Sequence, residues 1–232
     1  MHKLKSFVKK KFPCLVPIVR YAKIKILQFR SVEPVFTKIY YNNFWEGKES
    51  RSGPGSNLEQ TEQIRCELPI LIREIGARSI LDIPCGDFNW MKEVKLDLDF
   101  FIGADVVQEL VGNNIKKFGS VDRHFVKLDI TKDRLPQVDL VFCRDLLVHL
   151  PYRYIFKAIN NLRKSNSKYL LTTTFVHLEK NEDIITGEWR ELNLQKAPFC
   201  FPVPIKVIND NCFIEGGDSP KKYLGLWKIA DI

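Results

Sequence analysis

Short apolar runs alternate with helix-like segments along the middle of the chain. Apolar residues in Leu58–Ile75 recur every three or four positions and stop at Gly76, which predicts a helix. Short apolar runs then predict strands over Ser79–Ile83, Phe100–Ala104, His124–Leu128, Val138–Cys143 and Tyr169–Thr174. Helices are expected between the strands over Phe88–Val94, Val106–Phe118 and Tyr152–Arg163. This alternation predicts a doubly wound α/β fold, with a mostly parallel sheet and helices on both faces.

The last part of the chain has a different pattern. Ala197–Pro204 is rich in Pro and Phe, and a final strand is predicted over Tyr223–Ile229, after a turn at Gly216-Gly217. A hairpin late in the chain predicts that this strand joins the parallel sheet in the antiparallel direction, near its edge.

The net charge of +8 belongs to one end of the chain. Residues 1–30 hold nine Lys and Arg and no acid, whereas the remaining 27 basic residues face all 28 acidic ones. We therefore divide the chain into a basic, partly helical N-terminal extension over residues 1–41 and an α/β domain over residues 42–232. A nearly neutral domain has no surplus of cations for a nucleic-acid groove, so no nucleic-acid substrate is expected.

The extension contains a predicted helix, which Pro17 can open and which runs to Phe29. Since it mixes apolar residues with cations, it either lies on the anionic inner face of a membrane or packs on the domain or a partner subunit. Its apolar runs are too short for a secretory signal or a membrane span. The six cysteines are scattered without a Cys-x-x-Cys pair, which indicates reduced thiols in a cytoplasmic protein, and no metal site is predicted.

The turn after the first strand carries the main chemical signal, Asp82-Ile83-Pro84-Cys85-Gly86-Asp87. In doubly wound sheets, ligands bind beyond the carboxyl ends of the strands. A pyrophosphate site would need several glycines and a bare helix N-terminus, which makes a dinucleotide-dependent dehydrogenase the least favoured enzyme. One glycine and two carboxylates instead suit the sulfonium and ammonium groups of S-adenosylmethionine.

Acids also follow the next two strands. Asp105 can accept hydrogen bonds from both ribose hydroxyls of a nucleoside, and Asp129 can accept one from an adenine amino group. A single Asp after a strand is more often a helix N-cap. Three Asp residues at successive strand ends, Asp82, Asp105 and Asp129, together favour a nucleoside site.

Five segments in order, SILDIPCGD, FFIGAD, FVKLDIT, VDLVFCRDLLVHLP and YLLTTTF, resemble the successive motifs of class I S-adenosylmethionine-dependent methyltransferases. The resemblance covers Arg78–Thr174 and implies a Rossmann-like methyltransferase sheet. The family pattern has glycine where this chain has Pro84 and Phe88. The cofactor contacts that the resemblance implies are Asp82, Pro84, Cys85 and Gly86 at the first turn, Asp105 on the ribose, Asp129 and Ile130 on the adenine, and Cys143 and Arg144 at the methionine end.

The form DxPCGDxxW, preceded by ESRSGPGS, resembles a subgroup found in bacteria and some viruses and linked to surface-polysaccharide assembly. This narrower resemblance implies methylation of a sugar hydroxyl on a surface glycan or a nucleotide-sugar precursor. Two alternatives stay open, a methyltransferase of a small metabolite or lipid and a noncatalytic scaffold with the same fold. The retained Asp82, Gly86, Asp105 and Asp129 disfavour the scaffold.

A hydroxyl acceptor needs a group that removes its proton. His149 has a suitable ordinary pKa of about 6.5, although it can also be a helix-capping residue before Pro151. Asp145 can act as the base or orient an imidazole. Asp87 is the third candidate, because it points from the cofactor turn toward the acceptor.

Acceptor contacts are expected from Asn89, Trp90, Thr174, Arg190 and Asn193. The indole of Trp90 can offer a platform to a sugar ring or belong to the core. The stretch Ser52-Gly53-Pro54-Gly55-Ser56 is either a cap over the cofactor or a flexible linker. As a cap, it would reach the cofactor through Ser56 and would offer backbone N–H groups to its carboxylate.

Overall fold

A seven-stranded sheet forms the framework of the computed structural model, which describes residues 31–210 and 222–232. The strands are β1 (Ser79–Asp82), β2 (Phe100–Asp105), β3 (Arg123–Lys127), β4 (Leu140–Cys143), β5 (Tyr169–Thr174), β6 (Lys206–Asn209) and β7 (Tyr223–Lys228). They lie in the order β3-β2-β1-β4-β5-β7-β6, and β1 to β5 pair in parallel, so the predicted doubly wound sheet is confirmed. The order reverses at β1, which places a ligand crevice beyond the carboxyl ends of β1 and β4.

The late antiparallel strand is confirmed, with one addition. β7 runs antiparallel to β5, with Leu226 opposite Leu171. It is not the edge strand, because β6 pairs antiparallel with its other side. β6 was not predicted. Only Ile208 of its four residues is buried, so it lacks the apolar run that identifies the other strands.

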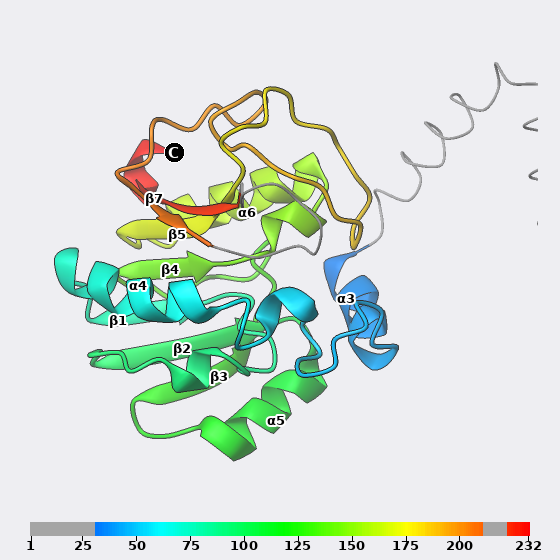
Figure 1. Ribbon diagram of the computed structural model, residues 1–232, viewed down its shortest axis with the longest axis vertical. Helices are drawn as coiled ribbons and strands as arrows, with labels where there is room; N and C mark the ends of the chain where they lie inside the picture. Colours follow the sequence, from blue (N-terminus) through cyan, green and yellow to red (C-terminus); the bar gives the residue numbers. More distant parts are fainter. Residues whose placement is uncertain (1–30, 211–221) are drawn as a thin grey trace, which may run out of the picture.

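Helices lie on both faces of the sheet, and one lies beyond the carboxyl ends of the parallel strands (Figure 1). The described residues form α3 (Val32–Tyr41), α4 (Glu62–Glu74), α5 (Gln108–Phe118) and α6 (Tyr152–Lys164), of which α3 is the one beyond the strand ends. The predicted helices that correspond to α4, α5 and α6 are confirmed, apart from shifts at their ends. Each buries apolar residues at helical spacing, as α6 does with Ile155, Ala158, Ile159 and Leu162.

The prediction of a helix over Phe88–Val94 was wrong, since only the short 3₁₀ turn η2 (Met91–Glu93) forms there. Phe88 has φ of 59°, in the left-handed region that a right-handed helix cannot include. Its buried ring packs against three other Phe rings at centroid distances of 5.1 to 5.4 Å. Glycine, which the family pattern has here, adopts this conformation without steric cost. In this chain, burial of the ring offsets the cost.

The sequence-based division assigned α3 to the N-terminal extension, yet this helix packs on the α/β domain. Val32, Phe36 and Ile39 are buried against the core, and Glu33 pairs with Lys127 at the end of β3. The signal was present in the sequence, because these apolar residues recur at helical spacing. The helix and membrane contact predicted within residues 1–30, and the turn at Gly216-Gly217, lie outside the described residues.

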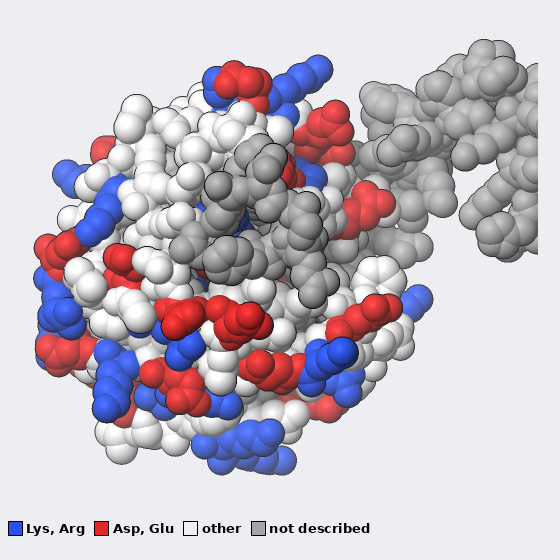
Figure 2. Space-filling view, in the orientation of Figure 1, with Lys and Arg blue, Asp and Glu red and all other residues white. Residues whose placement is uncertain are grey.

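The surface of the described residues carries mixed charge. Lys and Arg are interspersed with Asp and Glu on the face shown in Figure 2. No helix within residues 31–210 and 222–232 is long and apolar enough to cross a membrane. The same residues contain no group of three or more His, Cys, Asp or Glu side chains that could hold a metal ion.

Replacing Phe88 tests the balance between left-handed strain and ring burial. Phe88→Ala is expected to lower the free energy of unfolding by about 3–5 kcal/mol, because it removes a buried ring. Phe88→Gly loses the same ring but relieves the strain, so it should be about 1 kcal/mol more stable than Phe88→Ala. This reverses the usual order of Ala and Gly, and urea unfolding followed by circular dichroism measures it. A glycine variant less stable than the alanine variant would contradict the account.

Candidate active site

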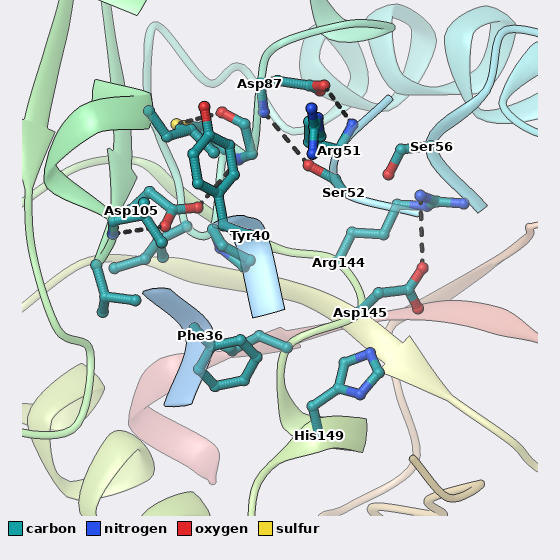
Figure 3. Close-up of a pocket in the computed structure, with 18 of the residues that line it drawn as sticks. Phe36, Tyr40, Arg51, Ser52, Ser56, Asp87, Asp105, Arg144, Asp145 and His149 are labelled. Carbon is teal, nitrogen blue, oxygen red and sulfur yellow. Dashed lines mark hydrogen bonds and ion pairs between the residues drawn. The ribbon is translucent and has the colours of Figure 1, made fainter. Parts of the chain in front are cut away.

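A cavity opens at the carboxyl ends of β1, β2, β3 and β4 (Figure 3). Its wall includes residues of α3 and of the loop Glu49–Ser56, which we call the cap loop. Most of the predicted site residues line it, namely Ser56, Pro84, Cys85, Gly86, Asp87, Asn89, Trp90, Asp105, Asp129, Ile130, Arg144, Asp145 and His149. The topology thus gathers residues from four strand ends and one loop into a single site.

Asp87 fastens the cap loop to the turn after β1. Its Oδ1 accepts a hydrogen bond from Ser50 Oγ, and its Oδ2 accepts one from the Arg51 backbone N–H, both at 2.8 Å. The Asp87 N–H in turn donates to Ser52 Oγ at 3.3 Å. Gly86 permits this approach, since its φ is 54° and a Cβ there would lie 2.2 Å from Ser52 Oγ. Both carboxylate oxygens of Asp87 are engaged, so this geometry favours an anchor and not a base.

Asn89 adds a second fastening between the same two segments. Its Nδ2 donates to Glu49 Oε1 at 2.6 Å and to the Ser56 carbonyl at 3.2 Å. Glu49 Oε1 also accepts from the Leu58 N–H at 2.9 Å. The cap loop is therefore an ordered part of the site, held by residues of the DxPCGDxxW motif.

The backbone N–H groups of the cap loop are largely used within these contacts. Arg51 N–H donates to Asp87, while Ser52 and Gly53 N–H donate to Ser50 Oγ and to the Ser50 carbonyl. The sequence suggested that these N–H groups could bind a cofactor carboxylate, but their hydrogen bonds within the loop and to Asp87 leave them unavailable for it. Arg51 itself lines the cavity, and its guanidinium makes no hydrogen bond or ion pair within residues 31–210 and 222–232.

Asp105 lies at the end of β2, next to the first turn. Its Oδ1 accepts from the Val107 N–H at 3.0 Å, and its Oδ2 accepts from the Gly86 N–H at 3.3 Å. Burial raises the pKa of the Asp105 carboxyl to about 6, against the opposing effect of these backbone hydrogen bonds. Hydroxyl groups that donate to the carboxylate would favour the ionised form and lower this pKa.

Asp82 lies behind the turn and not on the cavity wall. Its side chain is buried, and it is not among the residues that line the cavity. Desolvation and the nearby Asp105 raise its pKa well above the ordinary value, although Arg144 acts in the opposite direction. The predicted contact of Asp82 with the methionine part of a cofactor has no support from this position.

Asp129 and Ile130 line the cavity where β3 ends. Oδ1 of Asp129 accepts from the N–H and the Oγ of Thr131, at 2.9 and 2.6 Å. Oδ2 lies 3.7 Å from the Lys132 ammonium. With Oδ1 engaged locally, Oδ2 is the oxygen through which Asp129 could accept from a ligand.

Four charged side chains form a compensated network beside the cavity. Arg144 donates two hydrogen bonds to Asp210, at 2.9 and 3.1 Å, and its Nη1 lies 3.4 Å from Asp145. Lys222 pairs with both Asp145 and Asp210. Desolvation disfavours ionisation of Asp145, but Lys222 and Arg144 outweigh it and hold its pKa well below the ordinary value. A carboxylate with so low a pKa is a weak base, which disfavours Asp145 in that role.

His149 ends the 3₁₀ turn η3 (Leu147–His149), and Figure 3 shows its ring beside Asp145. Its Nδ1 lies 2.9 Å from the Glu188 carbonyl. Because a carbonyl oxygen only accepts, Nδ1 must carry the proton, and the neutral ring keeps its lone pair on Nε2. Desolvation lowers the pKa of His149 below 6.5, although the Glu188 hydrogen bond and Asp145 raise it. Of the three predicted bases, the geometry therefore favours His149.

The predicted acceptor residues separate into two groups. Asn89 and Trp90 line the cavity. Thr174, Arg190 and Asn193 are buried outside it, and their side chains hydrogen-bond to neighbouring backbone groups. These residues satisfy carbonyl groups at chain turns, so their positions give no support to a role in acceptor binding. The same holds for the predicted cofactor contact of Cys143, which is buried within β4 outside the cavity.

Several cavity residues were not predicted. They include Val32, Phe36 and Tyr40 of α3, together with Trp45 and Arg51, and apolar residues near the strand ends such as Ile83, Val107 and Leu146. The amphipathic pattern of α3 could have indicated a packed helix, but nothing in the sequence shows that this helix covers the strand ends. Arg51 stands within the ESRSGPGS segment, and only the fold shows that this residue lines the site.

Comparison with known proteins finds similarity in structure only. No protein-family model matches the chain, and no curated protein sequence is a significant match. The N-methyltransferase NodS from Bradyrhizobium japonicum, solved in complex with S-adenosylhomocysteine, superposes with a TM-score of 0.57 at 12% identity, over 82% of this chain and 97% of that chain. The methyltransferase domain of bacterial CtHen1-CN superposes with a TM-score of 0.54 at 12% identity, over 74% of this chain and 100% of that chain. The chain therefore has the fold of the class I S-adenosylmethionine-dependent methyltransferases.

Proposed function

We propose that this protein is an S-adenosylmethionine-dependent O-methyltransferase with His149 as its general base. One observation carries the proposal. A single cavity joins the Asp105 carboxyl, at the glycine turn, with an imidazole whose Nε2 lone pair is available. The fold supports the choice of cofactor, because NodS was solved with S-adenosylhomocysteine, the demethylated form of S-adenosylmethionine.

The residues on the cavity wall fit the parts of this cofactor. Asp105 would accept hydrogen bonds from the ribose hydroxyls, and Asp129 with Ile130 would hold the adenine. Pro84, Cys85 and Gly86 form the turn along which the methionine part would lie. Arg51 is a cation on the wall without a carboxylate partner among the described residues, and the methionine end would present a carboxylate to it.

The chemistry divides between the cofactor and the chain. Bound S-adenosylmethionine supplies a methyl carbon that its sulfonium has already activated. Nε2 of His149 takes the proton from the acceptor hydroxyl as the acceptor oxygen attacks. The resulting imidazolium is stabilised by the nearby Asp145, which its cationic partners keep ionised. Phe36 and Trp45 pack against the imidazole and would limit the access of water to it.

For the acceptor, we propose a sugar hydroxyl on a surface glycan or a nucleotide-sugar precursor. The resemblance of DxPCGDxxW and ESRSGPGS to the polysaccharide-linked subgroup supports this choice. Aromatic side chains on the cavity wall, such as Tyr40 and Trp90, also suit the apolar face of a sugar ring. For a membrane-linked glycan, the nine cations of residues 1–30 would favour attachment to an anionic membrane surface.

Cofactor binding tests the first part of the proposal. Calorimetry should show S-adenosylmethionine and S-adenosylhomocysteine binding at micromolar concentration, with NAD inert, and Asp105→Asn should weaken both by about 10–100-fold. In the protein without cofactor, the pKa of Asp105 is about 6, and ribose hydroxyls favour its ionised form. The affinity for S-adenosylmethionine should therefore fall about tenfold per pH unit below that value. Asp105→Asn should lose this pH dependence. No binding of S-adenosylmethionine by the wild type would overturn the proposed function.

Arg51→Met tests the carboxylate contact. The variant should bind S-adenosylmethionine about tenfold or more weakly, because it loses a charge-assisted hydrogen bond. Its affinity for decarboxylated S-adenosylmethionine should match that of the wild type. Lys48→Met removes an exposed cation outside the cavity and should change neither affinity. An equal loss for both ligands in Arg51→Met would assign Arg51 another role.

His149→Ala separates binding from proton transfer. The variant should keep the wild-type affinity for S-adenosylmethionine, while transfer of a radiolabelled methyl group to sugars and nucleotide sugars falls about 10²–10⁴-fold. In the wild type, kcat/KM should decline as the pH falls through the lowered pKa of His149, because only the neutral ring accepts a proton. Full activity in the alanine variant would require a different base.

A further inference from the structure

His149 is enclosed by two aromatic rings from segments distant in sequence. The Trp45 indole lies 5.0 Å from the imidazole, centroid to centroid, at an interplanar angle of 31°. Phe36 of α3 meets the imidazole edge-to-face at 6.4 Å, and it lies 6.2 Å from Trp45. All three rings line the cavity, so they form one aromatic wall beside the proposed base.

The cap loop makes room for the Trp45 ring. Gly53 is buried and has φ of 95°, and a Cβ there would lie 3.2 Å from the Trp45 Cβ and 3.7 Å from its ring. The Asp87 carboxylate fixes the backbone of this loop two residues before Gly53. The position of Trp45 therefore depends on the cap loop as well as on α3.

Hydrogen bonding alone leaves the orientation of the imidazole incompletely determined. Within the described residues, the His149 ring makes one hydrogen bond, from Nδ1 to the Glu188 carbonyl, and the ring can swing about a single such bond. The charged groups that act on the ring are Asp145, Arg190 and Lys222. Their fields change its charge state but do not define its plane. The indole face, inclined by 31° to the imidazole, restricts the swing and occupies space that water would otherwise take.

We propose that Trp45 is a positioning residue for His149, whose indole face keeps Nδ1 on the Glu188 carbonyl and Nε2 turned toward the acceptor. This inference rests on the proposed function, because it acts through the base named there. The contact joins the proton-transfer end of the cavity to the loop that covers the cofactor end.

Nitrogen-15 NMR of the His149 ring tests the proposal without any acceptor. His149→Gln identifies the ring signals among those of four histidines. In the wild type, the neutral ring should be protonated at Nδ1 and its pKa should lie below 6.5. Trp45→Leu keeps an apolar side chain but removes the ring face, so the pKa should rise toward 6.5 and protonation at Nε2 should increase.

Matched variants decide the result. Trp45→Phe should restore the pKa and the tautomer of His149 toward the wild type. Phe44→Ala removes an exposed neighbouring ring outside the cavity and should change neither the pKa nor the tautomer. If Trp45→Leu does not fold by circular dichroism, Trp45→Met provides the same test. A folded ring-free variant with the wild-type pKa and tautomer would overturn the proposal. Failure of the proposed function would be distinct, because S-adenosylhomocysteine would then not bind the wild type in calorimetry.

Discussion

The Asp87 carboxylate joins the two segments on which the cavity depends. It holds Ser50 Oγ and the Arg51 N–H at 2.8 Å each, and so fastens the cap loop to the turn after β1. Helix α4 and strand β1 lie between these segments in sequence, so only the folded domain brings them together. Once the loop is held, Arg51 lines the cavity and Gly53 leaves room for Trp45. The part of the cavity wall at Arg51 and the part at Trp45 and His149 therefore share one support.

Local partners give chemically similar groups different tasks. Burial raises the pKa of Asp105 to about 6. Its partners, neutral backbone N–H groups, lower the pKa but do not outweigh burial. Asp145 is desolvated as well, yet its pKa is lowered, because Arg144 and Lys222 lie against it. His149 loses hydration and keeps one proton on Nδ1, which leaves Nε2 as an acceptor. One cavity thus holds a carboxyl with a raised pKa, a carboxylate that stays ionised and an imidazole protonated on Nδ1.

The sheet could be predicted because its central strands are buried. Val141 and Phe142 in β4, for example, are fully buried, and this environment requires a continuous apolar run that the sequence displays. β6 could not be found in this way, since only Ile208 is buried in it. The helix expected at Phe88 failed for a tertiary reason. Packing of the Phe88 ring among three other rings holds its backbone in a left-handed conformation that no local pattern signals.

The sequence by itself determined the class of fold and the composition of the first turn, because both depend on residues close together along the chain. One glycine between two carboxylates was the basis for predicting a cationic ligand, and this composition can be read from the sequence. Only the tertiary structure decided which side chains line the cavity. It placed Arg51 and Trp45 on the wall and engaged Asp87 in the cap loop. It also buried Arg190 against backbone carbonyls. These outcomes depend on contacts between segments far apart in sequence, and a single sequence does not encode those contacts as a local pattern.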